Sequence, residues 1–190
     1  MPRAGLSPEA IVDLTLQLID EEGPAAVTLL AVAGRAGVAP PSLYKHVRNL
    51  AELNTLVSVR VMDELADRSR EAVLGLSGAQ ALRAFMNAWR HYVVIHPGRY
   101  AAMIQTSRPE LAEAGGRLAD IVLAVLRAYG LEETDAIHAT RCLRSAVHGF
   151  TVLETTGGFG LPVDLDDSYE LLTQMIISGL PKPAQDRADV

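Results

Sequence analysis

Cysteine is nearly absent, since the 190-residue sequence contains only Cys142. A single thiol excludes an internal disulfide and does not suggest a cysteine-rich metal site, so nothing in the sequence argues for an oxidising compartment. His138 precedes Cys142 by one helical turn, but a zinc site needs further ligands and none is spaced to join this pair. We therefore expect neither a metal ion nor another cofactor.

Long apolar runs are also lacking. The longest segment without a charged residue, 23–34, is too short to span a membrane. The Met-Pro-Arg start does not have the apolar core of a secretory signal. The sequence thus predicts a cytoplasmic protein without a membrane partner.

Basic residues are not in excess, because the formal net charge is −6 at pH 7. Residues 1–60 alone carry five basic and six acidic side chains. This balance opposes indiscriminate coating of nucleic acid, which depends on neutralising many phosphates and releasing their counterions. It leaves room for a sequence-specific reader that places a few positive groups on one face.

Signatures of catalysis are missing as well. The chain has no Gly-x-Ser-x-Gly nucleophile elbow, no His-Glu-x-x-His pair and no motif of paired catalytic carboxylates. Residues 157–160, Gly-Gly-Phe-Gly, resemble a phosphate-binding loop, but they follow a predicted helix rather than a strand and lack the Lys-Ser/Thr pair. We predict no catalytic residues and no enzymatic activity.

What the chain does contain is apolar residues at helical spacing, with no alternating strand pattern. Their spacing predicts an all-α protein with about nine helices over residues 8–22, 29–36, 40–47, 50–73, 77–95, 99–106, 110–129, 135–154 and 167–178. Thr134 or Asp135 is expected to cap the eighth of these helices, and Asp166 or Asp167 the ninth.

The segment 28–47 has the pattern of a helix-turn-helix motif. Thr28 stands where it can cap a first short helix, and Gly37 stands where the turn needs a residue that tolerates positive φ. A proline pair at 40–41 suits the first turn of a second helix, predicted to run to about Val47. In such a motif the second helix fits the major groove of DNA.

A helical wheel divides the second helix into two faces. Leu43 and Val47 share the inward face, and His46 points partly inward. The outward face can contact phosphates and base edges, although a solvated helix face would have the same composition. Its residues are Pro41, Ser42, Tyr44, Lys45 and Arg48.

The residues T-L-L-A-V-A-G-R-A-G-V, followed by S-L-Y-K-H-V, resemble the tetracycline-repressor (TetR) family of DNA-binding regulators. The resemblance implies a three-helix DNA-binding domain and double-stranded operator DNA as a partner. The predicted DNA-binding residues are Thr28, Arg35, Pro41, Ser42, Tyr44, Lys45, His46 and Arg48. Two positions depart from the family pattern, Ala39 in place of a capping Ser or Thr and Leu50 in place of a Lys, so we expect modest intrinsic affinity.

The second part of the chain resembles a regulatory domain of the same family. The segment H-G-F-T-V-L-E at 148–154, followed by G-G-F-G-L-P, is similar to the subclass named for a Trp-His-Gly signature, although Arg144 stands where its tryptophan is expected. We therefore predict a DNA-binding domain over 1–50, a helical ligand-sensing and dimerising bundle over 51–183, and a polar tail over 184–190.

Large adaptable side chains gather on the early helices of this second part. Such groups line apolar cavities for small molecules, but more often they are simply core. The predicted ligand-binding residues are Met86, Trp89, Tyr92, His96, Tyr100, Met103 and His148, with His91 and Gln105 as further polar candidates. The expected effector is a small apolar or amphipathic compound.

The last two long helices carry apolar faces suited to a four-helix interface between two copies of the chain. The residues of these faces are Ile137, Leu143, Val147, Leu171, Leu172, Met175 and Ile176. The sequence thus predicts a homodimeric, ligand-relieved repressor of a palindromic operator. Two alternatives stay open: a helical sensor or scaffold that has lost DNA binding, and a small all-α enzyme.

Overall fold

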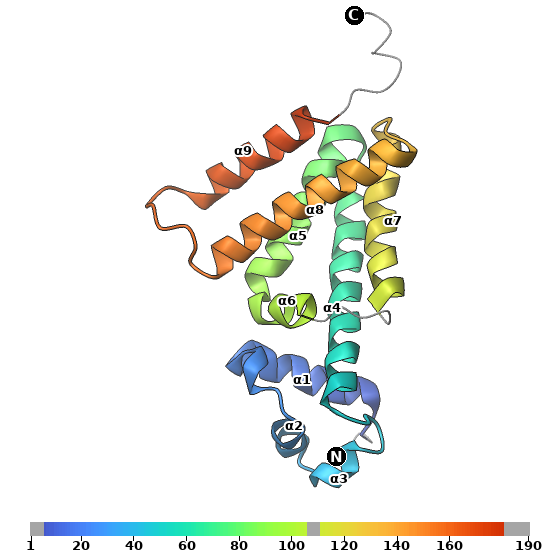
Figure 1. The fold of residues 1–190 in the computed structure, drawn as a ribbon, viewed down its shortest axis with the longest axis vertical. Coiled ribbons are helices and arrows are strands. Elements are labelled where there is room, and N and C mark those ends of the chain that lie inside the picture. The colour runs from blue at the N-terminus through green and yellow to red at the C-terminus, as the bar shows by residue number, and fades with distance from the viewer. Residues whose placement is uncertain (1–5, 106–110, 181–190) are drawn as a thin grey trace, which may run out of the picture. The chain divides into compact units, whose positions relative to one another are not determined.

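The computed structural model describes residues 6–105 and 111–180, and every regular element in these ranges is a helix (Figure 1). The described elements are α1 (Pro8–Glu22), the 3₁₀ helix η1 (Pro24–Ala26), α2 (Leu29–Ala36), α3 (Pro40–Leu43), α4 (Leu50–Val73), α5 (Gly78–Ile95), α6 (Pro97–Ile104), α7 (Ala112–Ala128), α8 (Glu133–Thr155) and α9 (Leu165–Ser178). The all-α prediction with about nine helices is confirmed. None of the described helices is long and apolar enough to cross a membrane.

The described residues fall into two compact units. Unit 1 lies within 1–64 and 96–115, and unit 2 within 65–95 and 116–190. Helix α4 is therefore shared, since its first part belongs to unit 1 and its last part to unit 2. The functional boundary predicted at residue 50 stays a prediction, and the predicted tail 184–190 lies outside the described residues.

Unit 1 is built on α1, whose ends follow from local chemistry. The side chain of Ser7 accepts a hydrogen bond from the backbone N–H of Ala10 at 3.2 Å, which satisfies one of the open donors of the first turn. Gly23 ends the helix at φ +85°. The core of this unit is formed by Ile11, Val12, Leu16, Leu18, Ile19, Val32, Ala33, Leu43, Val47, Leu53, Val57 and Val61.

Helices α2 and α3 form the predicted helix-turn-helix. Thr28 Oγ1 accepts from the N–H of Ala31 at 3.0 Å, and Gly37 adopts φ +67° at the turn. Leu43 and Val47 are 0% and 1% exposed, so the predicted inward face packs into the core of unit 1. Both prolines lie in the first turn of α3.

The predicted length of the second helix is wrong. Regular helix ends at Leu43, and Tyr44–His46 form a turn in which Leu43 O accepts from the N–H groups of His46 and Val47 at 2.8 and 2.9 Å. Leu43 O accepts at i+3 as well as at i+4, which is the tightening with which helices commonly end. The two prolines occupy the first turn, where N–H groups have no helical partner, so they favour the start of the helix and do not set its end.

Helix α6 belongs to unit 1, although its residues lie within the predicted sensing domain, 51–183. It packs against α1 and η1. Gly98 allows the close approach, since a Cβ atom there would lie 3.1 Å from both Ile19 Cγ2 and Ile19 O. The sequence pattern placed this helix in the second domain because helical spacing alone does not show which neighbour an apolar face covers.

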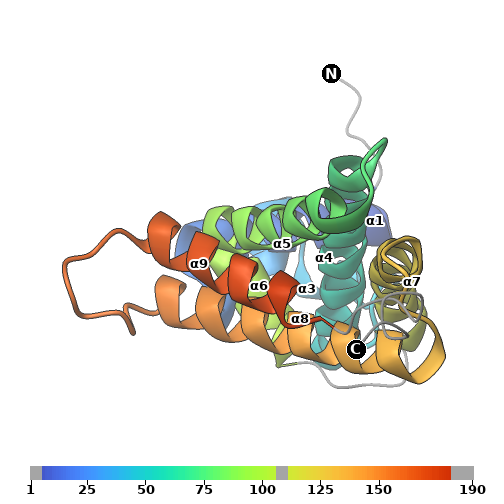
Figure 2. The same cartoon turned by 90° about the horizontal axis from the view of Figure 1, so that it is seen from above.

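Unit 2 is centred on α5, which packs against α8 and α9 (Figures 1 and 2). Helix α9 also packs on α8, so the three helices cover one another's apolar faces. The large buried residues on α5 are Leu82, Phe85, Met86, Trp89, Tyr92 and Val93. Tyr169 of α9 joins this core and donates its O–H to Met86 O at 2.7 Å.

Two predicted helix caps are wrong. Helix α8 begins at Glu133 with Glu132 at the cap, because the buried Leu131 fixes the preceding turn by donating its N–H to Leu126 O at 2.9 Å. Thr134 and Asp135 therefore lie inside the first turn. In α9 the cap is Asp164, which accepts from the N–H of Asp166 at 2.7 Å, so Asp166 and Asp167 are helical. Three nearby aspartates suit a cap equally well, and the backbone chooses among them.

The predicted start of the seventh helix at 110 lies outside the described residues, as does the predicted end of the sixth helix at 106. Within the described residues, α6 extends to Ile104 and α7 begins at Ala112.

The assignment of two dimer-face residues is wrong. Leu143 and Val147 are 1% and 0% exposed and pack inside the chain. Their α8 face is the one that covers α5 and α9.

Candidate functional site

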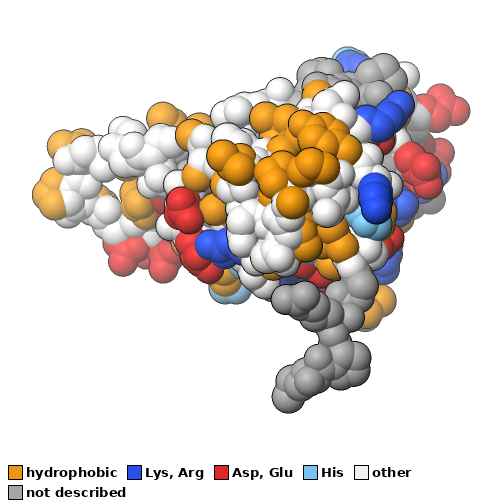
Figure 3. All heavy atoms as spheres, turned by 90° about the horizontal axis from the view of Figure 1, so that it is seen from below, with side chains coloured by type: hydrophobic (Ala, Val, Ile, Leu, Met, Phe, Trp, Pro, Cys, Tyr) orange, Lys and Arg blue, Asp and Glu red, His pale blue; other side chains and the backbone are white. Residues whose placement is uncertain are grey.

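The outward face of α3 and its following turn is open to solvent. Pro41, Tyr44 and Lys45 are exposed, with Tyr44 at 56%, while Ser42 and His46 are half-buried. Figure 3 views the molecule from below and shows apolar side chains gathered in the middle of this view. The buried Leu43 and Val47 fix the backbone, so the exposed side chains are presented from a packed support.

Arg48 lies beyond this turn and pairs with Glu52 in the first turn of α4. Its Nη2 and Nε lie 3.0 and 3.1 Å from Glu52 Oε1. The Arg48 guanidinium, followed by its backbone N–H, lowers the pKa of Glu52. Asn49 caps the same helix through its Oδ1 on the N–H of Glu52 at 2.9 Å. The Arg48 side chain is 84% exposed and can reach a phosphate, but its charge is partly balanced.

Thr28 and Arg35 differ from the α3 residues in their surroundings. The Thr28 hydroxyl is engaged as the cap of α2, although the residue is exposed. Arg35 is an ion-pair partner of Glu21 and lies 3.7 Å from Glu22 at the end of α1. These ion pairs link α2 to α1. The Arg35 side chain is 22% exposed, so part of its charge also lies at the surface.

The N-terminus of α3 is weakly capped, as the sequence predicts. Ala39 supplies no side-chain hydrogen bond to the first turn, and Ser42 N–H donates to Ala39 O at 2.9 Å. Leu50, the second departure, is the first residue of α4 and is half-buried rather than directed fully into solvent. A Lys at position 50 would add a second positive charge near Arg48 for contact with phosphates, and Leu50 adds none.

Replacing Ala39 with Ser is expected to tighten operator binding by about two- to fivefold. A serine hydroxyl in the extended backbone of this position can accept from the N–H of Ser42, which here donates to Ala39 O, and such a cap is worth roughly 0.5–1 kcal/mol. Fluorescence anisotropy with operator DNA measures the effect. Ala39→Val is the control because it adds bulk without an acceptor. Nanomolar affinity of the unaltered protein at physiological salt, with no gain from Ser, would contradict the prediction.

The predicted ligand residues do not meet in one described site. Met86, Trp89 and Tyr92 are buried in unit 2, where His148 is half-buried. The remaining three, His96, Tyr100 and Met103, lie in unit 1, with Tyr100 and Met103 buried. The assignment to one pocket stays a prediction.

Two of the unit 2 residues have properties that suit a ligand. Trp89 is 5% exposed and its Nε1 donor has no hydrogen-bond partner among the residues that the structure describes, which leaves a buried polar group unsatisfied there. Burial lowers the pKa of His148, and the charge of Arg144 adds to this effect. The neutral imidazole that results near pH 7 has one donor and one acceptor nitrogen.

A charged junction joins three helices of unit 1. Arg99 of α6 donates from Nε to both carboxylate oxygens of Asp20 in α1, at 2.9 and 3.1 Å, and from Nη1 to Glu64 of α4 at 3.0 Å. His96 Nδ1 lies 3.9 Å from the same Asp20. The Arg99 side chain is only 16% exposed, so movement of α6 relative to α1 or α4 would disturb a desolvated ion pair.

Unit 2 carries a surface groove of about 850 Å³ that the sequence did not reveal. Ala84, Ala88 and His91 of α5 line it, together with Asp166, Asp167 and Glu170 of α9. None of the seven predicted ligand residues lines this groove. The available signal was the alanine pair four residues apart on α5, since small side chains on one helical face leave space beside it.

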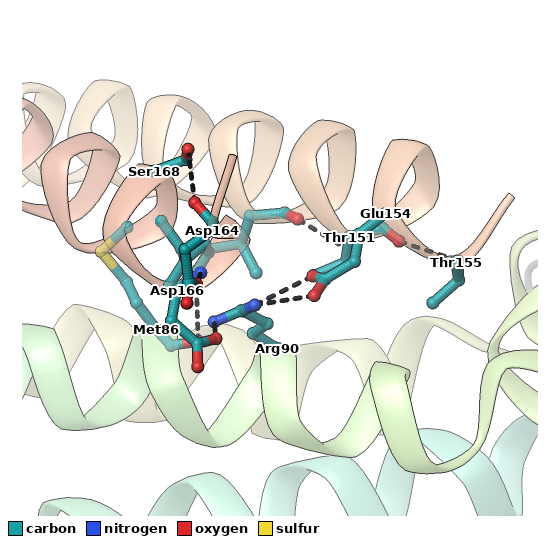
Figure 4. Close-up of polar contacts among 10 residues, drawn as sticks. Met86, Arg90, Thr151, Glu154, Thr155, Asp164, Asp166 and Ser168 are labelled. Carbon is teal, nitrogen blue, oxygen red and sulfur yellow. Dashed lines mark hydrogen bonds and ion pairs between the residues drawn. The ribbon is translucent and has the colours of Figure 1, made fainter. Parts of the chain in front are cut away.

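Arg90 also lines this groove and joins α5 to α8 and α9 (Figure 4). Its Nε and Nη2 donate to the two oxygens of Glu154 at 2.9 and 2.7 Å, and its Nη1 lies 2.7 Å from Asp166 Oδ1. The guanidinium also stacks on the ring of Tyr169 at 4.8 Å. Burial raises the pKa of Tyr169, so this phenol stays protonated and donates to Met86 O.

Comparisons with known proteins agree with this geometry. Residues 11–53 match the family described as bacterial regulatory proteins of the tetR family, and residues 82–176 match the tetracyclin repressor-like C-terminal domain. The chain is 33% identical over 182 residues to the uncharacterized HTH-type transcriptional regulator YobS of Bacillus subtilis, covering 94% of this chain and 95% of YobS. It is 35% identical over 178 residues to Rv0681 of Mycobacterium tuberculosis, a regulator of the same description, covering 92% and 80%.

Solved structures share the fold. Apo ActR from Streptomyces coelicolor superposes with a TM-score of 0.73 at 22% identity, covering 93% of this chain and 95% of ActR. ActR in complex with actinorhodin gives 0.71 at 21% identity, with 93% and 97% covered. The putative regulatory protein SCO4313 gives 0.75 at 23% identity, with 90% and 95% covered.

Proposed function

The chain belongs to the TetR family of helix-turn-helix transcriptional regulators, and on this premise we propose that it is a ligand-relieved repressor that binds a palindromic operator as a homodimer. The observation that carries the proposal is the exposed surface of α3 and the turn after it, held by the buried Leu43 and Val47. The family membership makes the protein a DNA-binding regulator; the operator form, the dimer and the direction of the ligand response are proposed here.

The proposed DNA contacts divide into two groups. Tyr44, Lys45 and Arg48 are placed to meet phosphates, and Pro41 and Ser42 to meet base edges. His46, Thr28 and Arg35 complete the proposed set, the latter two from α2 and its cap. The near-neutral charge of this region and the Arg48–Glu52 pair both favour modest affinity, since few phosphates are neutralised.

Lys45→Ala is expected to weaken binding similarly for all DNA sequences and to flatten the salt dependence. Each phosphate that the protein no longer neutralises reduces the slope of log K against log salt by about 0.9. Titrations of operator and random duplexes at several salt concentrations measure the slope. Arg127→Ala is the control, because it removes the same charge from an exposed position of α7 in unit 2. An unchanged slope would reject Lys45 as a phosphate contact.

The proposed dimer uses α8 and α9. After Leu143 and Val147 are removed from the predicted face, three of its apolar residues stay largely exposed, namely Ile137 at 46%, Leu171 at 58% and Met175 at 63%. Leu172 and Ile176 are half-buried. Two copies of this helix pair can bury such residues in a four-helix interface. The two-fold axis then favours an operator with half-sites about 34 Å apart or a near multiple.

The proposed effector is a small apolar or amphipathic compound. ActR, which shares the fold, has been solved with actinorhodin. The unsatisfied Nε1 of Trp89 and the neutral His148 support a site in unit 2 that pairs an apolar wall with polar anchors. An effector lowers operator affinity only by the factor by which it prefers the non-binding conformation of the protein.

We propose that the Arg99 junction and α4 transmit this preference. Arg99 connects α6 to both α1 and α4, and α4 continues without a break into unit 2. Helix α1 packs on α2, which packs on α3. A shift of α6 or α4 would therefore change the support on which the exposed turn of α3 is presented.

The test is selection of binding sites from a randomised duplex pool by the purified, ligand-free protein at moderate salt. We expect a palindrome whose half-site spacing matches one helical turn of DNA or a near multiple. Recovery of no sequence, repeated after denaturing and refolding to remove co-purified ligand, would favour the sensor without DNA binding. A bound compound recovered chemically changed after incubation would instead favour the small all-α enzyme.

A further inference from the structure

Leu30 is a large apolar side chain that the fold leaves outside its core. It is the second residue of α2 and is 72% exposed, whereas Val32 and Ala33 on the same helix are buried. A leucine at this level of exposure contributes little burial to folding, and a polar residue could replace it without loss of packing. A single exposed leucine is ordinary, so its neighbours decide whether it has a role.

Other exposed positions of the helix-turn-helix are apolar as well. Pro41 and Tyr44 are exposed on α3 and its following turn, and α2 packs directly against α3. Gly34, one turn beyond Leu30, is exposed, and a Cβ atom there would meet no atom of the described residues within 4 Å.

The charged groups near this surface are largely committed to other partners. Arg35 pairs with Glu21, and Arg48 pairs with Glu52. Bidentate recognition of guanine depends on a free Arg or Lys fork, and recognition of adenine depends on Asn or Gln. Hydrogen-bonded readout therefore has few donors here, and Lys45 is the remaining basic side chain of the exposed turn.

The major groove presents one apolar group, the 5-methyl of thymine, and apolar side chains recognise it by contact. We propose that Leu30 is a specificity-determining residue that reads the 5-methyl group of a thymine in each operator half-site. The inference rests on the proposed function, since it assigns chemistry to the DNA-binding surface. It adds a residue from α2 to a face that the sequence pattern assigned mainly to the second helix.

The expected effect follows from the size of a methyl group. Burying one such group is worth about a fourfold change in affinity, so two half-sites together give roughly 15-fold. Leu30→Ala should therefore weaken operator binding by about this factor. Its binding to random duplex should stay unchanged, because phosphate contacts do not involve Leu30.

The deciding experiment uses the selected operator with deoxyuridine replacing thymidine at one symmetric pair of positions at a time. Deoxyuridine keeps every hydrogen bond of thymidine and lacks only the methyl. At one pair of positions we expect roughly 15-fold weaker binding by the unaltered protein and no weakening for Leu30→Ala. Leu74→Ala is the control, since Leu74 is 70% exposed and lies in unit 2.

The outcomes separate the two claims. If an operator is recovered but Leu30→Ala loses the same factor as the unaltered protein at every deoxyuridine position, the role of Leu30 is overturned alone. The same holds if Leu30→Ala binds the operator as tightly as Leu74→Ala. If no operator is recovered from the pool, the proposed function fails and this inference fails with it.

Discussion

Replacing both Leu171 and Met175 with Glu is expected to convert the proposed dimer to a monomer and to weaken operator binding by about 100-fold or more. Both side chains are exposed on α9, at 58% and 63%, so the change leaves the core of the chain intact. In a dimer the two glutamates of each copy would enter an apolar interface without partners. Loss of the linked second half-site removes an avidity gain of about 10²–10⁴.

Sedimentation measures the oligomeric state, and fluorescence anisotropy measures operator affinity. The matched control is Leu74→Glu with Leu76→Glu, which also introduces two charges at exposed leucines, at 70% and 42%, in the connection between α4 and α5. The control should stay dimeric and bind normally. A glutamate variant of α9 that remains dimeric, with unchanged circular dichroism, would place the interface elsewhere.

Arg90→Met is expected to destabilise unit 2 by about 3–5 kcal/mol. The side chains of Arg90 and Glu154 are 16% and 13% exposed, so removing the guanidinium leaves a largely buried carboxylate without its partner. The stacking on Tyr169 is lost as well. Trp89 is the only tryptophan of the sequence and neighbours Arg90 on α5, so its fluorescence during urea unfolding reports on this unit.

Two further variants define the cause. Arg83→Met removes a more exposed ion pair with Glu170 from the same helix and should cost less than about 1 kcal/mol. Adding Glu154→Leu to Arg90→Met should restore more than half of the lost stability, because the carboxylate that stays unpaired, Asp166, is 83% exposed and hydrated. If Arg90→Met and Arg83→Met destabilise equally, the buried pair has no special role.

Local signals were sufficient for most of the helix-turn-helix. Thr28 caps α2 and Gly37 takes a positive φ because a side-chain acceptor and a missing Cβ act on their own backbone. The inward positions of Leu43 and Val47 followed from helical geometry. The length of α3 did not, because the apolar spacing of Leu43 and Val47 is the same whether Tyr44–His46 form regular helix or a tightened turn.

The sequence pattern did not predict the ion-pair partners of charged side chains or the exposure of single apolar ones. Arg35 pairs with Glu21, and Arg99 with Asp20 and Glu64, across separations that no local rule specifies. Leu30 shows the same limit, because the spacing that predicts α2 does not reveal that its second residue stays 72% exposed.

The sequence by itself determined the all-α class, the positions of most helices and the helix-turn-helix with its inward and outward faces, since caps, turns and helical periodicity act over a few residues. Only the tertiary structure decided that α6 packs with unit 1, that Leu143 and Val147 are core, and that Arg90 is buried between α5, α8 and α9. These outcomes depend on which apolar faces meet, and contacts between distant segments are set by shape and packing of the folded chain.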